Sequence, residues 1–345
     1  MIRIGIICPS EIAYRRFLPA CKEAEGISYV GVAVASAKEW FQEENSKEIE
    51  KKAETVLKKE WEKAEEFQKN FGGEIFDGYE TMLSSDKIDA VYLPLPPALH
   101  YQWAKKALEY GKHVFLEKPF ATKEEEAKDL IAMAKEKKLA LQENYMFVYH
   151  DQMKVIEQEI KSGSIGDVRL YRVSFGFPRR AAGDFRYNKA LGGGTILDNG
   201  GYTIKLGAEL LGDTAKVVYG KKNYTDEFDV DLFGSAVMEN EEGMTAQLSF
   251  GMDNAYKCDL EVWGSTGTLF TGRILTAPAG FAPTMTIKTN EGEVVKELPA
   301  DDTFLKSIKH FKECVLDEKI REDNYKVIAK QAELLQEFLE LAKER

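Results

Sequence analysis

The clearest structural signal lies in residues 90–119, which have the sequence AVYLPLPPALHYQWAKKALEYGKHVFLEKP. Two short apolar runs, Ala90–Leu93 and His113–Leu116, enclose a stretch with helical character at Ala98–Tyr110. A strand, a helix and a second strand in this order form a right-handed βαβ unit with parallel strands. Helices cover both faces of a parallel sheet, so its strands are nearly all apolar, as these two are.

The same alternation extends over the whole N-terminal part of the chain. Further strands are predicted at Ile2–Cys8, Tyr29–Ala35 and Ala140–Glu143, with another helix at Lys123–Lys137. Alternating strands and helices predict a doubly wound parallel sheet, that is, a Rossmann domain, which we place at residues 1–145. Lys and Glu crowd residues 39–69, which we interpret as one extended amphipathic helix or two joined helices decorating this domain. A partner or subunit contact is the alternative for this segment.

The pattern changes after about residue 150. A helix predicted at Asp151–Ser162 is followed by segments that alternate polar and apolar residues, and residues 303–341 return to a helical pattern. The predicted strands are Arg169–Phe175, Val217–Tyr224, Leu232–Met238, Thr245–Phe250, Asp259–Trp263 and Thr284–Lys288. This pattern predicts a C-terminal α+β domain at residues 146–345, with an open and mostly antiparallel sheet.

Composition excludes several classes of function. The 345 residues carry a formal net charge of -11, and an acidic surface repels the phosphate backbone of nucleic acid. The four cysteines are scattered and form no CxxC pair, so we expect free thiols and neither a disulfide framework nor a metal site. No apolar run reaches the roughly 18 residues of a membrane helix, and no signal-peptide pattern is present, so we expect a cytoplasmic protein without a membrane partner.

Candidate cofactor-binding residues follow each strand of the predicted parallel sheet, because ligands bind at the carboxyl ends of such strands. Along the chain these residues are Cys8, Ser10, Glu11 and Ile12, then Ser36 and Lys38, then Leu95, Pro96 and His100, then Glu117 and Lys118, and finally Asn144. Their gathering on one sheet edge predicts a crevice for a dinucleotide.

The first two turns bear on the identity of this dinucleotide. A GxGxxG turn brings small residues close to a pyrophosphate, and here the matching positions hold Cys8, Ser10 and Ala13, which are small but not glycine. An ordinary βα turn is therefore the alternative at this point. After the second strand, Ser36 and Lys38 stand where NAD-specific sites tend to carry a carboxylate. This favours NADP(H), with NAD(H) as the alternative.

Two further features carry candidate catalytic groups. Lys118 lies between a buried strand and a proline, where it could hydrogen-bond a reacting oxygen; a surface lysine is the alternative. The run Gly192–Gly194 opens a helical pattern, so its backbone is expected to approach something closely. In that pattern Asp198 and Tyr202 are four residues apart and share one helix face, which favours a phenol acid–base group over a core tyrosine.

Together, Glu117-Lys118-Pro119 after an apolar strand and Gly-Gly-Gly-x-x-x-Asp-x-Gly-x-Tyr downstream resemble the Gfo/Idh/MocA oxidoreductase family. The resemblance covers nearly the whole chain. It implies a Rossmann domain, a C-terminal domain whose open sheet often forms the interface of a homodimer or homotetramer, and nicotinamide-dependent chemistry on sugars. Many members carry His at the position of Tyr202, whereas sugar ketoreductases and dihydrodiol dehydrogenases carry Tyr. The chain departs from the common pattern at Lys205 and in its glycine-poor phosphate turn.

A narrower likeness concerns the substrate. The runs at residues 184–187, 248–252, 260–265 and 298–302 are similar to those of NDP-hexose 3-ketoreductases, which reduce a keto group on a nucleotide-linked sugar. This likeness implies that Lys118 orients the keto oxygen and Tyr202 donates the proton. Asp198 would fix the substrate or the lysine, and Arg186, with Arg179 and Arg180, would be a candidate for the substrate's phosphates.

Two other functions stay open at this stage. A dehydrogenase that oxidises a free sugar (an aldose) or a trans-dihydrodiol would use the same acid–base pair in the opposite direction. A non-catalytic sensor of the same fold would bind NAD(P) or a sugar without turnover. The joint presence of Lys118, Asp198 and Tyr202 argues against the sensor.

Overall fold

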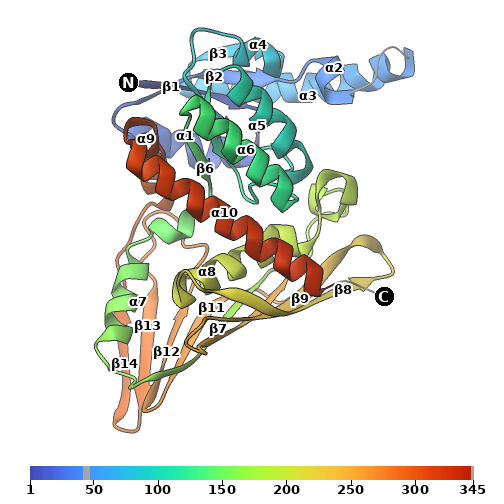
Figure 1. Cartoon of the computed structure of the whole chain (residues 1–345). Coiled ribbons are helices and arrows are strands. Elements are labelled where there is room, and N and C mark those ends of the chain that lie inside the picture. Colours follow the sequence, from blue (N-terminus) through green and yellow to red (C-terminus); the bar gives the residue numbers. More distant parts are fainter. Residues whose placement is uncertain (42–46, 343–345) are drawn as a thin grey trace. The chain divides into compact units, whose positions relative to one another are not determined.

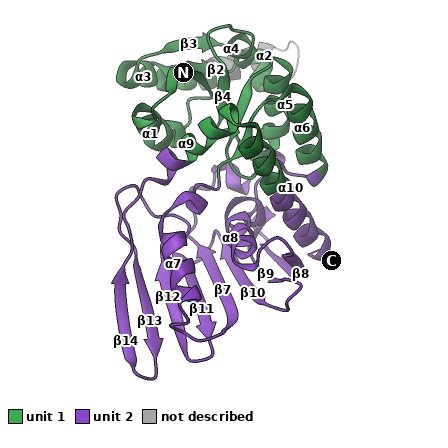
Figure 2. Ribbon diagram, turned by 60° about the vertical axis from the view of Figure 1, so that its left-hand side comes forward, with its two compact units in different colours: residues 1–120, 125–144, 307–328 green, residues 121–124, 145–306, 329–345 purple. Residues whose placement is uncertain are grey.

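The computed structural model describes residues 1–41 and 47–342 and divides into two compact units (Figure 2). The first unit comprises residues 1–120, 125–144 and 307–328, and the second comprises residues 121–124, 145–306 and 329–345. The chain therefore returns to the first unit near its C-terminal end.

The first unit contains a six-stranded sheet in which every neighbouring pair is parallel, in the order β3-β2-β1-β4-β5-β6 (Figure 1). Its strands are β1 (Ile2–Ile7), β2 (Ile27–Val34), β3 (Glu74–Asp77), β4 (Ala90–Leu93), β5 (His113–Leu116) and β6 (Leu141–Glu143). This is the doubly wound order of a Rossmann fold, so the predicted fold class of the N-terminal part is confirmed. The edge strand β3 was not predicted, because only Phe76 among its four residues is buried.

Helices lie between the strands of this sheet. They are α1 (Leu18–Glu23), α2 (Ala37–Phe41), α3 (Lys47–Phe71), α4 (Tyr79–Leu83), α5 (His100–Glu109) and α6 (Glu124–Lys137). The charged segment forms two helices, α2 and α3, although its residues 42–46 lie outside the described part of the chain. Helix α3 packs on β2 and buries Ala64 and Phe67.

A returning C-terminal segment completes the first unit. It belongs to two helices, α9 (Thr303–Leu316) and α10 (Glu318–Leu341), of which residues 307–328 pack in this unit. Gln142 in β6 donates to Ser307 Oγ at 2.8 Å, and Asn324 Nδ2 donates to Leu141 O at 2.6 Å. The hydroxyl of Tyr325 donates to Leu139 O. These helices therefore satisfy polar groups beside β6, which is an edge strand of its sheet.

The second unit contains an eight-stranded sheet in the order β14-β13-β12-β11-β7-β10-β9-β8. Its strands are β7 (Val168–Gly176), β8 (Lys216–Thr225), β9 (Phe228–Glu239), β10 (Thr245–Gly251), β11 (Lys257–Gly264), β12 (Gly267–Gly272), β13 (Thr284–Thr289) and β14 (Gly292–Glu297). Only the pair β7–β10 is parallel among the pairings described for this sheet. The predicted mostly antiparallel sheet is confirmed, with β12 and β14 as strands that the sequence did not indicate.

The two faces of this sheet differ. One face buries Tyr171, Val173 and Phe175 of β7 in a core shared with α7 (Gln152–Lys161), α8 (Gly201–Leu211) and residues 334–338 of α10 (Figure 1). The other face exposes large side chains, which are Tyr219, Phe233, Trp263 and Phe270. Within the described residues, no helix is long and apolar enough to pass through a bilayer.

Candidate active site

The predicted cofactor residues of the first unit lie at the carboxyl ends of β1, β2, β4, β5 and β6. These strands are parallel neighbours, so the structure brings the turns that follow them to one sheet edge. This is where an open α/β sheet binds its ligand. Among the described residues, no group of three or more His, Cys, Asp and Glu side chains is placed to hold a metal ion.

The turn after β1 holds a left-handed residue at the position where a GxGxxG turn has its first glycine. Cys8 has a φ of 82°, in the left-handed region that usually requires glycine. Its thiol lies 4.0 Å from Glu60 Oε2, and burial raises the pKa of Cys8 to about 12, so the thiol is neutral. Ser10 Oγ accepts a hydrogen bond from Ala13 N at 3.2 Å and caps the helix that follows. Glu11 is exposed and pairs with Arg15 at 2.8 Å.

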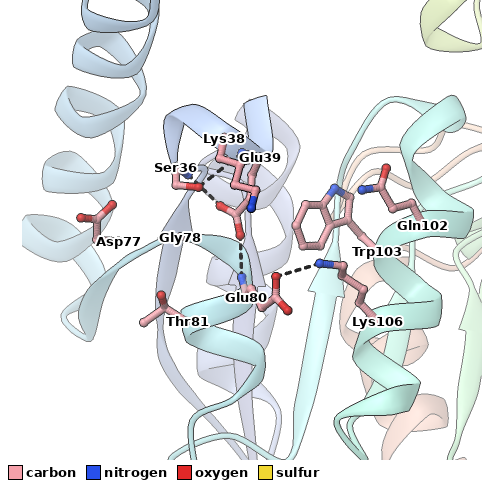
Figure 3. A pocket seen from close by; sticks show the side chains of 10 residues that line it. All are labelled: Ser36, Lys38, Glu39, Asp77, Gly78, Glu80, Thr81, Gln102, Trp103 and Lys106. Carbon is pink, nitrogen blue, oxygen red and sulfur yellow. Dashed lines mark hydrogen bonds and ion pairs between the residues drawn. The ribbon is translucent and has the colours of Figure 1, made fainter. Parts of the chain in front are cut away.

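A cavity of about 470 Å³ opens beside the turn after β2 (Figure 3). Ser36 and Lys38, predicted to face the ribose phosphate, both line it. So do residues that the sequence did not indicate, from α2, the end of β3, the start of α4 and α5, which are Glu39, Asp77, Gly78, Glu80, Thr81, Gln102, Trp103 and Lys106. A hydroxyl, two lysines and an aromatic ring in one cavity fit a phosphorylated ribose and its base.

The carboxylate of Glu39 is bound by backbone groups of two turns. Its Oε2 accepts from Ser36 N at 2.7 Å and from Tyr79 N at 3.0 Å, and its Oε1 accepts from Glu80 N at 2.8 Å. The side chain therefore caps α2 and α4 together. Nearby, Lys106 Nζ donates to Glu80 Oε2 at 2.7 Å, and this bond lowers the pKa of Glu80. The spacing Ser36-x-x-Glu39 is a capping-box signature that could have indicated Glu39 from the sequence.

Glu117 and Asn144, predicted from two different strands, are joined by a hydrogen bond. Asn144 Nδ2 donates to Glu117 Oε1 at 2.7 Å, and the hydroxyl of Tyr92 donates to the same oxygen at 2.6 Å. Burial raises the pKa of Glu117, and the two donors oppose this shift. Asn144 is held in turn by Ser307, whose hydroxyl donates to its Oδ1 at 2.8 Å. Lys118 is the residue after Glu117 in the chain, and its side chain is half-buried. A cis peptide bond joins it to Pro119.

The side chain of His100 joins two loops at this sheet edge. Its side chain is fully buried, with Nδ1 2.7 Å from Pro119 O and Nε2 2.7 Å from Leu95 O. Burial lowers the pKa of His100 to about 4, so the neutral ring donates to one of these carbonyls at a time. The cofactor contact predicted for His100 stays a prediction. Leu95 is buried in the same loop, and Pro96 is partly exposed.

Tyr202 and Asp198 belong to the second unit, where a π-helical turn at Ile196–Gly200 leads directly into α8. Tyr202 is 8% exposed and packs among aromatic rings. Asp198 Oδ2 accepts from Arg186 Nε at 2.7 Å, and Arg186 also pairs with Asp184 at 3.1 Å. Two predicted substrate residues, Arg186 and Asp198, are thus brought together as an ion pair. Arg179 instead pairs with Glu227 and Asp253.

The glycine run before this turn approaches the protein's own groups. A Cβ on Gly193 would lie 2.5 Å from Arg186 O, and one on Gly194 would lie 2.4 Å from Asp231 Oδ1. Asp231 accepts from Ile196 N at 2.9 Å, and burial raises its pKa. Asn199 Nδ2 donates to Phe175 O at 2.7 Å and to Gly251 O at 2.8 Å, at the ends of the parallel strands β7 and β10. The glycines thus lie close to other groups of the chain, as predicted, and the hydrogen bonds of Asp231 and Asn199 hold the turn against the sheet.

Comparison with known proteins places both units in one family. An oxidoreductase family with an NAD-binding Rossmann fold, GFO_IDH_MocA, matches residues 26–145, and the GFO/IDH/MocA C-terminal domain matches residues 153–270. A dTDP-3,4-didehydro-2,6-dideoxy-alpha-D-glucose 3-reductase from Actinomadura kijaniata is 38% identical over 91% of this chain and 88% of its own length. The protein of that name from Streptomyces violaceoruber is 35% identical over 91% of this chain and 85% of its own length.

A solved structure agrees with this assignment. KijD10, a 3-ketoreductase from Actinomadura kijaniata in complex with NADP and TDP-benzene, matches with a TM-score of 0.87 and 35% identity. The match covers 97% of this chain and 96% of that one. The resemblance predicted from Glu117–Pro119 and the glycine run is thereby confirmed. The chain belongs to the Gfo/Idh/MocA family of oxidoreductases, with an NAD-binding Rossmann fold.

Proposed function

We propose that this protein is an NADPH-dependent reductase of the 3-keto group of a dTDP-linked deoxysugar. The observation that carries the proposal is its 38% identity, over 91% of the chain, to a reductase of this kind. The match to a 3-ketoreductase bound to NADP and TDP-benzene supports the same substrate class. We place the enzyme in the cytoplasm, the location expected from its scattered thiols.

The chain's own residues supply the acid–base part of this reaction. When bound, the nicotinamide supplies a hydride, which forms the new C–H bond at the keto carbon. The phenol of Tyr202 gives its proton to the keto oxygen, so that the product is an alcohol. The ammonium of Lys118 orients that oxygen and stabilises the negative charge that develops on it.

Preference for NADPH follows from the cavity beside β2. Lys38 supplies a positive charge and Ser36 a hydroxyl, while the carboxylate of Glu39 is taken up by three backbone N–H groups. The carboxylate of Glu39 therefore does not need to face the ribose 2′ position, where it would repel a phosphate. The remaining predicted contacts in the turns after β1, β4, β5 and β6 belong to the same cofactor proposal.

Substrate binding by Arg186 stays a prediction, and the structure adds a condition to it. Its guanidinium is shared between Asp198 and Asp184, so its charge is largely balanced within the protein. We propose that Asp198 acts through Arg186, by fixing the side chain that meets the substrate's polar groups.

Turnover measurements separate the three candidate functions. The purified protein is incubated with NADPH and a dTDP-3-keto-deoxysugar and, in parallel, with NADP⁺ and aldoses or a trans-dihydrodiol. We expect turnover of the dTDP-3-keto-deoxysugar. Faster oxidation of a free sugar or diol would favour the dehydrogenase, and NADPH binding without any turnover would favour the sensor.

The variant Tyr202→Phe tests the proposed acid. It removes only the hydroxyl, so we expect kcat to fall by about a hundredfold or more while NADPH binding is retained. The measurement is steady-state turnover together with a fluorescence titration of NADPH. Unchanged kcat would remove Tyr202 from the mechanism.

We also propose that the protein forms a homodimer or homotetramer through the outer face of the eight-stranded sheet. That face exposes Phe270 and Trp263, and Arg172 stacks on Trp263 at 5.4 Å. Contiguous exposed aromatic residues on a sheet favour an interface. Sedimentation should give a smaller particle for Phe270→Glu, whereas Leu316→Glu, at a 73% exposed position elsewhere, should leave the mass unchanged.

A further inference from the structure

Three aromatic rings surround the ring of Tyr202 in the second unit. Tyr145 meets it edge-on at 5.0 Å and 88°, and Phe175 does so at 5.5 Å and 82°. Phe147 packs against it at 6.0 Å with a tilt of 38°. Such edge-to-face contacts have a preferred geometry, so they restrict how the central ring can turn.

Of these three rings, Tyr145 also contacts the backbone beside Tyr202. Its side chain is 2% exposed, and its hydroxyl lies only 2.2 Å from the place where a Cβ on Gly201 would stand. The next nearest atoms to that place are Tyr145 Cζ at 3.3 Å and Ile196 O at 3.7 Å. The hydroxyl therefore occupies a space that exists only because residue 201 is glycine.

Gly201 is a helical residue without a positive φ, so its conformation does not require glycine. Glycine in a helix is also unfavourable compared with alanine. The contact with the Tyr145 hydroxyl thus gives a physical reason for glycine at this position. Gly201 is fixed from another side as well, because its carbonyl accepts from Gln331 Nε2 at 3.0 Å.

We infer that Tyr145 is a positioning residue for Tyr202, and that the glycine at 201 is there to admit it. The Tyr145 ring sets the orientation of the Tyr202 ring, and its hydroxyl sets the distance between the Tyr145 side chain and the first turn of α8. A proton donor must be held close to its productive geometry, so a shift of this contact lowers the rate of proton transfer more than it weakens binding. The inference rests on the role proposed above for Tyr202.

The contact can be broken and restored with three variants. Gly201→Ala places a Cβ on the Tyr145 hydroxyl, and we expect kcat to fall about tenfold or more at an unchanged KM for NADPH. Tyr145→Phe alone removes the oxygen that sets this distance but keeps the ring, so kcat should fall less than in Gly201→Ala. In the double variant the nearest ring atom to the new Cβ is at 3.3 Å, so kcat should return close to that of Tyr145→Phe.

A matched control lies on the same helix. A Cβ on Gly207 would meet the flexible side chain of Met238 at 2.6 Å, so Gly207→Ala crowds α8 without touching the aromatic rings around Tyr202. We expect its kcat to remain near wild type. The pH profile of kcat is measured for all four variants, because a displaced proton donor changes the apparent pKa of the profile, whereas simple loss of stability does not.

The outcomes separate this inference from the proposed function. If wild-type protein reduces no 3-keto sugar, the proposed function fails, and the coupling between positions 145 and 201 is still measured by urea unfolding of the same variants. Wild-type kcat and pH profile in Gly201→Ala would overturn the inference. A double variant whose kcat is no higher than that of Gly201→Ala would also overturn it. If Gly201→Ala does not fold, a double variant that does not fold either would overturn it.

Discussion

At the scale of single residues, the carboxylate of Glu39 binds backbone groups beside the proposed cofactor site. Its carboxylate joins the turn after β2 to the start of α4 through Ser36 N, Tyr79 N and Glu80 N. The positions of Ser36 and Lys38 therefore depend on a side chain that itself faces the protein backbone. Charge-assisted bonds of this kind are about twice as strong as neutral ones.

We predict that Glu39→Gln lowers the preference for NADPH over NADH. The amide offers one acceptor oxygen, so its NH₂ group must face at least one of the three backbone N–H donors, and the turn carrying Lys38 loosens. KM for NADPH should rise about tenfold and KM for NADH much less. Asp77→Asn, which removes the same charge from the same cavity, is the control. Tighter NADPH binding in Glu39→Gln would instead mean that the carboxylate repels the phosphate.

At the scale of elements, the π-helical turn that carries Asp198 is fixed on the sheet by the glycines before it. Gly193 has no positive φ, yet a Cβ there would lie 2.5 Å from Arg186 O and 2.8 Å from Asn188 O. Both are backbone atoms, which cannot move aside as a flexible side chain can. The constraint on Gly193 is therefore steric and comes from the loop of residues 186–188.

Gly193→Ala should destabilise the protein by about 1–3 kcal/mol, the usual cost of overpacking a close contact. Gly183→Ala is the matched control, because it lies in the same connecting segment and a Cβ there meets nothing within 4 Å. Its free energy of unfolding should be close to wild type. Urea denaturation measures both, and equal stability of the two variants would contradict the steric explanation.

Two of the three strands that the sequence missed, β3 and β14, are less buried than the strands that it predicted. β4 and β5 were predicted with their observed bounds, because they are apolar and, apart from His113, fully buried. β14 was missed because all six of its residues are exposed, so its sequence has no alternation to detect. β3 and β14 are edge strands, which need fewer apolar residues than central ones.

At the scale of the whole molecule, the histidines make stability depend on pH. The chain has four, and burial lowers the pKa of each, to about 4 for His100 and His113. An unfolded histidine has its usual pKa of 6.5, so between pH 6.5 and about 4 the unfolded chain binds more protons than the folded one. The contribution of the histidines to the free energy of unfolding is therefore fully present above pH 6.5 and is lost as the pH is lowered through this window.

We predict that the free energy of unfolding decreases from pH 7 to pH 5, by up to about 1.4 kcal/mol per pH unit for a histidine as buried as His100. The carboxylates with lowered pKa, such as Asp89, lose their contribution only below the range of ordinary carboxyl groups, so they do not act in this window. Glu117 and Asp231, whose pKa burial raises, bind a proton more readily in the folded chain and reduce the slope that the histidines produce. Urea unfolding at pH 7, 6 and 5 measures the slope. His100→Gln should reduce it, and a constant free energy over this range would contradict the assignment.

The candidate site was predictable where it depends on position along a strand. Lys118, Glu117 and Asn144 follow strands whose apolar runs are evident, so their shared edge follows from parallel topology alone. His100 was placed on the correct edge, but its burial between two carbonyl groups depends on loop conformation that the sequence pattern does not contain. Tyr145 was passed over because its signal is an absent Cβ at Gly201, which only the packing reveals.

The segment of residues 307–328, which returns to the first unit, is synthesised long after the rest of that unit. The bonds from Asn324 and Tyr325 to the residues around β6 span 183 and 186 positions. On the ribosome, the first 144 residues emerge long before these partners exist, and the unit closes only after residue 325 has been translated. A gene fragment that stops after the parallel sheet leaves Gln142 and Asn144 without Ser307, so a split version of this protein needs its C-terminal helices supplied in trans.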